Sequence, residues 1–175
     1  GAIVGDAAKQ RYKLLGTDIE DVKKELLEVN NLALEGKPED MVITSHICRG
    51  NYHSTFFTSG PYDSVADYVF AKENVDALFL EYDDARSGGF APLAKVSPDK
   101  KVVLGLITTK TPQLEEKEVV IRRIHEAAKY IPLDRLYLSP QCGFASCEIG
   151  NKLTEEEQWA KLKLVKEIAE EVWGE

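Results

Sequence analysis

The feature that most restricts the fold is a regular alternation of short apolar segments and amphipathic helical segments. The apolar segments predict β-strands at residues 41–46, 77–82, 102–108 and 135–139. The segment VVLGLIT at 102–108 is almost continuously apolar, which is typical of a parallel sheet covered on both faces. Apolar residues at helical spacing predict helices at residues 17–35, 64–71, 115–130 and from 154 onward. Strands that alternate with helices form parallel sheets, so an α/β protein is expected.

The chain has 175 residues, and no linker or low-complexity segment divides it. We therefore expect a single domain over residues 1–175, in which residues 1–16 form an irregular N-terminal segment. A (β/α)8 barrel contains eight strand–helix units, and the four predicted here are about half of that number. The expected architecture is a partial TIM-type barrel, whose open sheet edges would permit self-association.

Capping residues mark where two of the helices begin. Thr17 with Glu20, and Thr154 with Glu157, fit the capping-box pattern, in which two side chains satisfy backbone N–H groups at the helix start. Apolar residues in the last helix predict its buried stripe, which consists of Trp159, Leu162, Val165, Ile168 and Val172. This stripe is expected to pack the helix against the sheet.

The composition restricts the partners and the location of the protein. A net charge of -8 and a pI near 5.0 argue against nucleic acid, whose binding needs clustered Lys and Arg. No apolar run is long enough to span a membrane. The first residues, GAIVGDAAKQ, lack the pattern of a secretory signal, so we expect a cytoplasmic protein. Three cysteines in such a chain predict reduced thiols rather than disulfides.

Residues with metal-binding side chains follow three of the predicted strands. His46 and Cys48 stand two residues apart at the end of the first strand, so both side chains project to the same side. Glu81 lies at the end of the second strand, and Cys142 and Cys147 follow the fourth. The carboxyl ends of barrel strands meet at one rim, where active sites lie. One His, one or two Cys and one Glu suit zinc, so the sequence predicts a zinc site there.

Other polar residues at this rim are candidates for substrate binding and catalysis. We expect Asp83, Arg86 and Ser87, which follow the second strand, to bind substrate. A salt-bridged loop formed by Asp83, Asp84 and Arg86 is an equally weighted alternative. Lys110 follows the third strand and therefore lies at the same predicted rim.

Three stretches carry a resemblance to a known family: HICRGN at 46–51, FLEYDDARSG at 79–88 and LSPQCGFAS at 138–146. They resemble the C-terminal catalytic region of cobalamin-independent methionine synthases, and more closely the shorter bacterial proteins related to them. The resemblance implies that the chain forms the C-terminal half of a (β/α)8 barrel. It also implies that a zinc ion is held by His46, Cys48, Glu81 and Cys142.

The resemblance further implies a zinc-dependent methyltransferase that methylates the thiol of homocysteine to form methionine. The methyl donor would be folate-type or another compound. Where the family has D-I-H-S-P-R, this chain has T-T-K-T-P-Q, so Lys110 replaces the family's histidine and is the candidate catalytic acid. This departure leaves the identity of the methyl donor open.

Two other functions are compatible with the same residues. One is a zinc-dependent alkyl transferase that acts on another small thiol, such as coenzyme M. The other is a non-catalytic half-barrel stapled by zinc. Because the family's homocysteine and folate sites draw heavily on the preceding half of the barrel, we expect this chain to be a piece of a longer protein. A half-barrel that pairs with another copy is the alternative, and we expect little or no activity from the chain alone.

Overall fold

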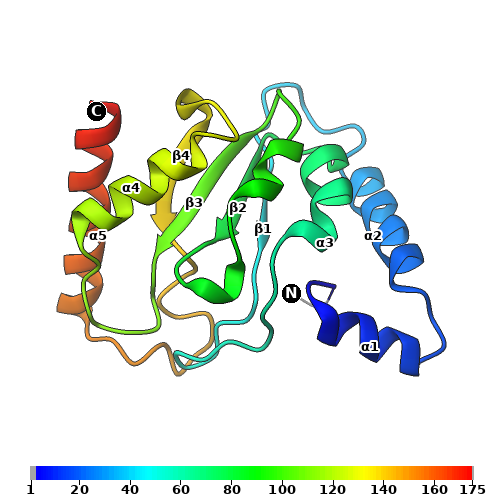
Figure 1. The fold of residues 1–175 in the computed structure, drawn as a ribbon, viewed down its shortest axis with the longest axis horizontal. Helices are drawn as coiled ribbons and strands as arrows, with labels where there is room; N and C mark the ends of the chain where they lie inside the picture. Colours follow the sequence, from blue (N-terminus) through cyan, green and yellow to red (C-terminus); the bar gives the residue numbers. More distant parts are fainter. Residues whose placement is uncertain (1–2, 175) are drawn as a thin grey trace.

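The computed structural model describes residues 3–174, and its four strands form one parallel sheet (Figure 1). The strands are β1 (Thr44–Ile47), β2 (Ala77–Glu81), β3 (Lys101–Ile107) and β4 (Leu136–Pro140). They lie in chain order, and each neighbouring pair is parallel. This confirms the predicted α/β class with parallel β/α units. Residues 1, 2 and 175 of the predicted domain lie outside the described part.

Helices precede and connect these strands. The α-helices are α1 (Asp6–Leu14), α2 (Ile19–Ala33), α3 (Asp63–Val65), α4 (Lys117–Ala127) and α5 (Glu155–Trp173). A π-helical segment (Ala66–Phe70) continues α3, and 3-10 helices cover Ala85–Ser87, Ala91–Lys95 and Leu133–Arg135. In the view of Figure 1, α4 and α5 lie to one side of the strands and α2 and α3 to the other. Within residues 3–174, no helix has the length and apolar character needed to cross a membrane.

One face of the sheet carries the main hydrophobic core. Leu80 of β2 and Leu104 and Leu106 of β3 point into this core, and each is at most 1% exposed. Ile124 of α4 and Ile168 of α5 belong to the same cluster and are fully buried. Burial stabilises each such side chain by about 1.5–3 kcal/mol. This packing fixes β2 and β3, which are the central strands of the sheet.

The opposite face and the two edges of the sheet are less covered. Phe79 is in register with His46 of β1 and Val103 of β3, and Val103 is in register with Tyr137 of β4. Tyr137 is 40% exposed, although it lies within strand β4. Among the described residues, β1 and β4 each pair with only one neighbouring strand, so each leaves an open edge.

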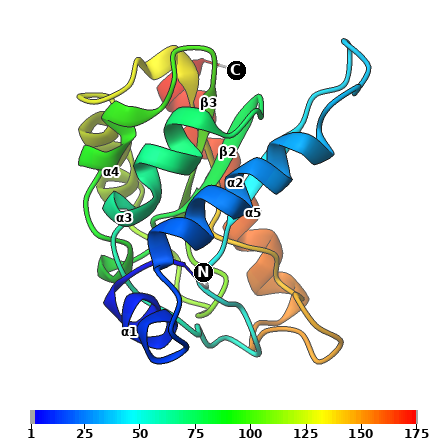
Figure 2. The same cartoon turned by 90° about the vertical axis from the view of Figure 1, so that its right-hand side faces the viewer.

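The prediction of an irregular segment over residues 1–16 is wrong for residues 6–14, which form helix α1 (Figure 2). Asp6 in the first turn and Lys13 in the last turn complement the helix dipole. Ala8 is the one buried residue of this helix in the described structure. Hydrophobic periodicity therefore does not reveal the helix, whose formation rests on residues of high helix propensity.

The two predicted capping boxes have different outcomes. The box of Thr17 and Glu20 is wrong, because Asp18 is the N-cap of α2 and its Oδ1 accepts from the Glu20 N–H at 2.9 Å. Asp is as good an N-cap as Thr, and the two stand side by side in the sequence. The box at α5 is confirmed. The Glu157 N–H donates to Thr154 Oγ1 at 3.2 Å, and the Thr154 N–H donates to Glu157 Oε2 at 2.7 Å.

The buried face of α5 is rotated from the predicted stripe. Trp159 is 59% exposed, so its assignment to the stripe is wrong, whereas Ile168 is fully buried. Leu164 and Lys161 are buried beside it. The Lys161 ammonium can be buried because it donates to the Glu115 carboxylate at 3.1 Å, a pairing that hydrophobic periodicity cannot show.

Candidate metal centre

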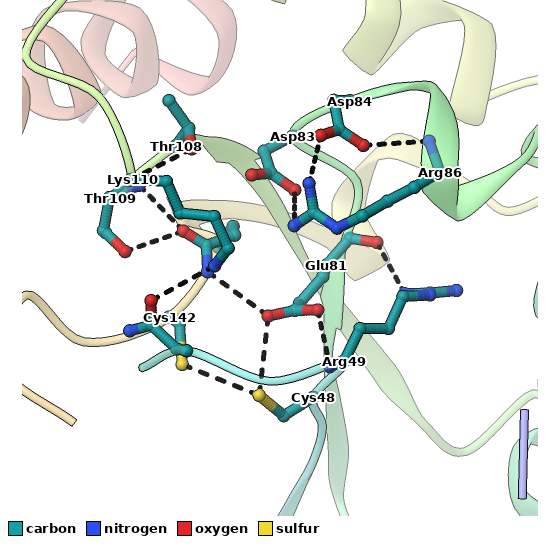
Figure 3. Close-up of polar contacts among 12 residues, drawn as sticks. Cys48, Arg49, Glu81, Asp83, Asp84, Arg86, Thr108, Thr109, Lys110 and Cys142 are labelled. Carbon is teal, nitrogen blue, oxygen red and sulfur yellow. Dashed lines mark hydrogen bonds and ion pairs between the residues drawn. The ribbon is translucent and has the colours of Figure 1, made fainter. Parts of the chain in front are cut away.

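The four predicted metal ligands come together at the carboxyl ends of the strands. His46 lies in β1, Cys48 directly follows β1, Glu81 is the last residue of β2, and Cys142 follows β4. One ligand atom of each side chain lies within 4.8 Å of those of the other three. Figure 3 shows Cys48, Glu81 and Cys142 pointing toward one another. Residues as far as 96 positions apart meet because parallel strands end at the same rim.

The distances within this cluster fit a tetrahedral zinc site. The Cys48 Sγ lies 4.0 Å from the Cys142 Sγ and 3.6 Å from the Glu81 Oε1. The His46 Nε2 lies 3.6 Å from the Cys142 Sγ. Zinc bonds of about 2.3 Å to sulfur and about 2.1 Å to nitrogen or oxygen give tetrahedron edges of about 3.8 and 3.6 Å. The donor set and its spacing could therefore hold a metal ion, and the distances are compatible with zinc.

Neighbouring backbone groups orient the ligands from β1. The His46 Nδ1 lies 3.2 Å from the Phe79 carbonyl oxygen, which can only accept, so Nδ1 carries a hydrogen and Nε2 is the ring nitrogen that faces the cluster. The Gly50 N–H donates to the Cys48 Sγ at 3.1 Å. Gly50 has a φ of 102°, and a Cβ there would lie 2.6 Å from the Phe57 nitrogen. Only glycine fits this turn, which positions the donor to Cys48.

Glu81 is fully buried, and each of its carboxylate oxygens is held by a neighbour. The Arg49 N–H donates to Oε2 at 2.8 Å, and the Gln141 Nε2 donates to Oε1 at 3.2 Å. The Gln141 Oε1 accepts from both N and Oγ1 of Thr109 at 2.7 Å, which turns its NH2 group toward Glu81. Sequence reasoning did not identify Gln141 or Arg49, although each adjoins a predicted ligand in the chain.

The guanidinium of Arg49 joins the ends of β1 and β2. It stacks on the Tyr62 ring at 3.9 Å, and its Nη2 donates to the Gly60 carbonyl at 2.7 Å. The Tyr62 hydroxyl donates to the Ile47 carbonyl at 3.1 Å and accepts from the Glu81 N–H at 2.8 Å. Burial raises the pKa of Tyr62 to about 12, which keeps the hydroxyl neutral. These contacts fix the backbone from which Cys48 and Glu81 project.

Contacts within the cluster favour the deprotonated form of one cysteine, Cys142. The hydrogen bond with Cys48 is the largest of the effects that lower the pKa of Cys142 to about 3, and hydrogen bonds with His46 and Ser146 act in the same direction. The hydrogen bond with Cys142, followed by burial, raises the pKa of Cys48. The hydrogen bond with Cys142 also raises the pKa of His46. The lowered pKa favours the thiolate form of Cys142, which is the form that binds metals.

Lys110 lies at the same rim, and only 9% of its surface is exposed. Its Nζ donates to the Asn51 Oδ1 at 3.1 Å. The Asn51 Nδ2 in turn donates to the Gly143 carbonyl and to the Ser146 Oγ, both at 2.7 Å. The Asn151 Nδ2 donates to the same Asn51 oxygen at 3.1 Å. Asn51 thus connects the loops that follow β1, β3 and β4.

The residues after β2 form the salt-bridged loop that the sequence leaves as an alternative. The Arg86 Nη2 donates to the Asp83 Oδ1 at 2.8 Å, and Nη1 pairs with Asp84 (Figure 3). The side chains of Asp83 and Arg86 are 1% and 6% exposed, and Ser87 is buried. Within residues 3–174, Asp83 Oδ2, Arg86 Nε and Ser87 Oγ have no hydrogen-bond partner. Substrate binding by these three residues stays a prediction.

Comparison with known families and sequences gives a consistent result. The family described as cobalamin-independent synthase, catalytic domain, matches residues 22–171. The uncharacterized protein YxjG of Bacillus subtilis is 51% identical over 165 residues, which cover 94% of this chain and 44% of YxjG. The 5-methyltetrahydropteroyltriglutamate–homocysteine methyltransferase of Bacillus licheniformis is 25% identical over 170 residues, or 96% of this chain and 20% of that enzyme. The chain thus spans less than half the length of these relatives.

Solved structures share the fold. A provisionally assigned vitamin-B12 independent methionine synthase from Listeria monocytogenes is 42% identical, with a TM-score of 0.70 over 91% of this chain and 44% of that one. A B12-independent methionine synthase from Shewanella sp. W3-18-1, solved in complex with selenomethionine, is 24% identical, with a TM-score of 0.69 over 87% of this chain and 44% of that one. These matches confirm the predicted architecture, the C-terminal half of a (β/α)8 barrel.

Proposed function

The chain belongs to the cobalamin-independent methionine synthase family, and we propose that it supplies the metal centre of a zinc-dependent homocysteine methyltransferase. The observation that carries this proposal is the cluster of His46, Cys48, Glu81 and Cys142, whose ligand atoms lie within 4.8 Å of one another. Two sulfurs, one imidazole and one carboxylate are suited to zinc rather than to magnesium or calcium, which prefer oxygen ligands.

The residues around the cluster are suited to exchange of one ligand. A zinc ion held there would lower the pKa of a bound thiol and keep it as a thiolate at neutral pH. With two thiolates and one carboxylate the site would have a formal charge of about −1, which favours a reactive bound thiolate over activation of water. We propose Glu81 as the exchangeable ligand. Arg49 and Gln141 would keep hydrogen bonds to its carboxylate after it leaves the metal.

The proposed reaction is a methyl transfer to sulfur. The homocysteine thiol gives up its proton, which the departing donor takes up in the net reaction, and the thiolate sulfur uses an electron pair to form a bond to the methyl carbon. The bond between that carbon and the donor breaks, and the donor keeps its electron pair. We propose a folate-type donor, because the Bacillus licheniformis relative is named for 5-methyltetrahydropteroyltriglutamate. By the resemblance, Lys110 is the counterpart of the family's histidine. The donor's identity and a cytoplasmic location stay predictions.

We also propose that Asp83, Arg86 and Ser87 line the substrate site. All three follow Glu81 at the rim, and each has one buried polar atom without a partner among the described residues. Leaving such an atom unpaired costs about 1–3 kcal/mol, which a polar group of a substrate would offset. The salt bridge between Asp83 and Arg86 would hold these atoms in place.

X-ray absorption at the zinc edge tests the proposed function. The protein would be purified without chelator and measured with and without homocysteine, alongside Cys142→Ser and Cys147→Ser. Cys147 is the matched control because it is the remaining cysteine and lies outside the ligand cluster. We expect one zinc per chain, a sulfur-rich shell that gains a sulfur when homocysteine is added, and loss of one sulfur in Cys142→Ser only. Zinc ligands that do not change when homocysteine is added would instead support a structural, non-catalytic zinc site.

A further inference from the structure

The ammonium of Lys110 is a buried charge at the rim that takes no part in the metal-ligand cluster. Lys110 is buried, and the partner of its Nζ is a neutral amide oxygen, that of Asn51. Among residues 3–174, no carboxylate forms a salt bridge with it, whereas buried Lys161 pairs with Glu115. Burying a charge without an opposite charge beside it is costly, so a buried ammonium whose partner is a neutral amide is a candidate for binding an anion.

The position of this ammonium is fixed by a polar network. The Asn51 oxygen that accepts from Lys110 also accepts from Asn151, so the amide is oriented with its NH2 group toward the loop after β4. There it donates to the Gly143 carbonyl and the Ser146 Oγ, both at 2.7 Å. Asn151 is itself held, because its Nδ2 donates to the Thr109 carbonyl at 2.7 Å. A preorganised charge loses little freedom on binding a ligand.

The same network reaches the metal centre. The Ser146 Oγ, which accepts from Asn51, lies 3.7 Å from the Cys142 Sγ. Lys110 is therefore connected to the metal-ligand cluster through one asparagine, Asn51, and one serine, Ser146. Homocysteine has its thiol at one end and its carboxylate four bonds away, so one molecule presents a sulfur for a metal and an anion for a cation.

We propose that Lys110 binds a carboxylate of the substrates as a fixed positive charge, in place of the acid role that the family's histidine suggests. This inference rests on the proposed function, because it assumes that a thiol binds at the metal centre. The carboxylate belongs either to the acceptor thiol or to the methyl donor. The chemistry at Lys110 is the same in both cases, a charge-assisted hydrogen bond from an ammonium to a carboxylate oxygen.

Three thiols that differ in one group separate these possibilities. Homocysteine carries an amine and a carboxylate, 4-mercaptobutanoate only the carboxylate, and 3-mercaptopropylamine only the amine. Each would be titrated into the cobalt-substituted protein, in which thiolate binding changes the absorption spectrum. The variants are Lys110→Met, which removes the charge, and Lys110→Arg, which keeps it. Retention of the cobalt spectrum and of the urea unfolding midpoint would show that each variant is folded.

We expect Lys110→Met to weaken binding of the two carboxylate-bearing thiols by about tenfold or more and to leave 3-mercaptopropylamine unchanged. Lys110→Arg should keep much of the wild-type affinity for these two thiols. If only 5-methyltetrahydrofolate, measured by equilibrium dialysis, loses affinity in Lys110→Met, the carboxylate belongs to the donor. If thiols bind and neither ligand depends on Lys110, the inference is overturned and the proposed function stands. If no thiol changes the spectrum, the proposed function itself fails.

Discussion

Replacing Gln141 by methionine tests whether the amide holds Glu81 in place for the metal. Methionine has nearly the length and volume of glutamine but no N–H donor, so the 3.2 Å hydrogen bond to the Glu81 Oε1 is lost. The Arg49 N–H still donates to the other carboxylate oxygen at 2.8 Å. One of the two groups that orient Glu81 would therefore remain, and the carboxylate could rotate about that bond.

The expected effect on zinc affinity follows from the hydrogen bond that is removed. A hydrogen bond to a charged group contributes about 1.5–3 kcal/mol, which corresponds to a loss of about 10- to 150-fold in affinity. This range agrees with the loss of about 10- to 100-fold that is typical when a group behind a metal ligand is removed. Thr109→Val should weaken affinity by less than about threefold, because the Thr109 backbone N–H still orients the Gln141 amide at 2.7 Å.

Competition with a chromophoric chelator measures the zinc dissociation constant of each variant. Gln113→Met is the matched control, because Gln113 is exposed and only its backbone carbonyl takes part in a described contact, which the substitution keeps. Urea unfolding of the metal-free variants separates a local change at Glu81 from a general loss of stability. A Gln141→Met protein that binds zinc within threefold of wild type would refute the assigned role of this hydrogen bond.

Further substitutions test the packing that supports the rim, and urea unfolding measures each. Leu164→Ala should lower the free energy of unfolding by about 2–5 kcal/mol, and Trp159→Ala by less than about 0.5 kcal/mol, since Leu164 is 8% and Trp159 59% exposed. Equal losses of unfolding free energy in the two variants would contradict the observation that Leu164, and not Trp159, faces the core. Arg49→Lys should lower the free energy of unfolding by about 2–4 kcal/mol, because lysine cannot reproduce the stack on Tyr62 and the hydrogen bonds to backbone carbonyls. An unchanged urea midpoint would contradict this prediction. Thr154→Ala should lower the free energy of unfolding by about 1 kcal/mol, because the N-cap of α5 is lost. An unchanged free energy of unfolding would contradict the capping box.

The two central strands were predictable because a parallel strand under helices is apolar along nearly its whole length. The predicted strand 102–108 matches β3 (Lys101–Ile107), which is buried at every residue after the first. Helix faces were less predictable, because a buried charge needs a distant partner. Lys161 can occupy the core-facing side of α5 because its ammonium donates to the Glu115 carboxylate, 46 residues away, at 3.1 Å and to the Gln113 carbonyl at 2.6 Å. Periodicity within one helix contains no information about such a pair.

The ligands were predictable for a similar reason. His, Cys and Glu are chemically distinctive, and the alternation of strands and helices places the ends of successive strands at one rim. The groups that hold these ligands are not distinctive by residue type. Gln141 acts through an amide whose orientation depends on Thr109, and Arg49 acts partly through its backbone N–H. Their roles depend on angles and distances that only a three-dimensional structure provides.

Metal binding and turnover make different demands on the chain. All four ligands, with Arg49 and Gln141 behind Glu81, lie between residues 46 and 142, and each contact within the cluster is made by the chain itself. In contrast, the sheet face that carries Tyr137 is partly open, β1 and β4 have free edges, and the chain spans 44% of the length of YxjG. Ligand sites bury most of a substrate and therefore need walls on more than one side.

We therefore expect the isolated chain to bind zinc while showing little or no homocysteine methylation. Zinc binding needs only strand ends that the hydrophobic core already holds together, whereas a methyl donor and an acceptor must be aligned by surfaces on both sides of the reacting atoms. Chelator competition measures the first property, and formation of methionine from homocysteine with 5-methyltetrahydrofolate measures the second. Methionine formation that is lost in Cys142→Ser but retained in Cys147→Ser would show that four β/α units suffice for catalysis. That result would contradict the argument from the open face of the sheet.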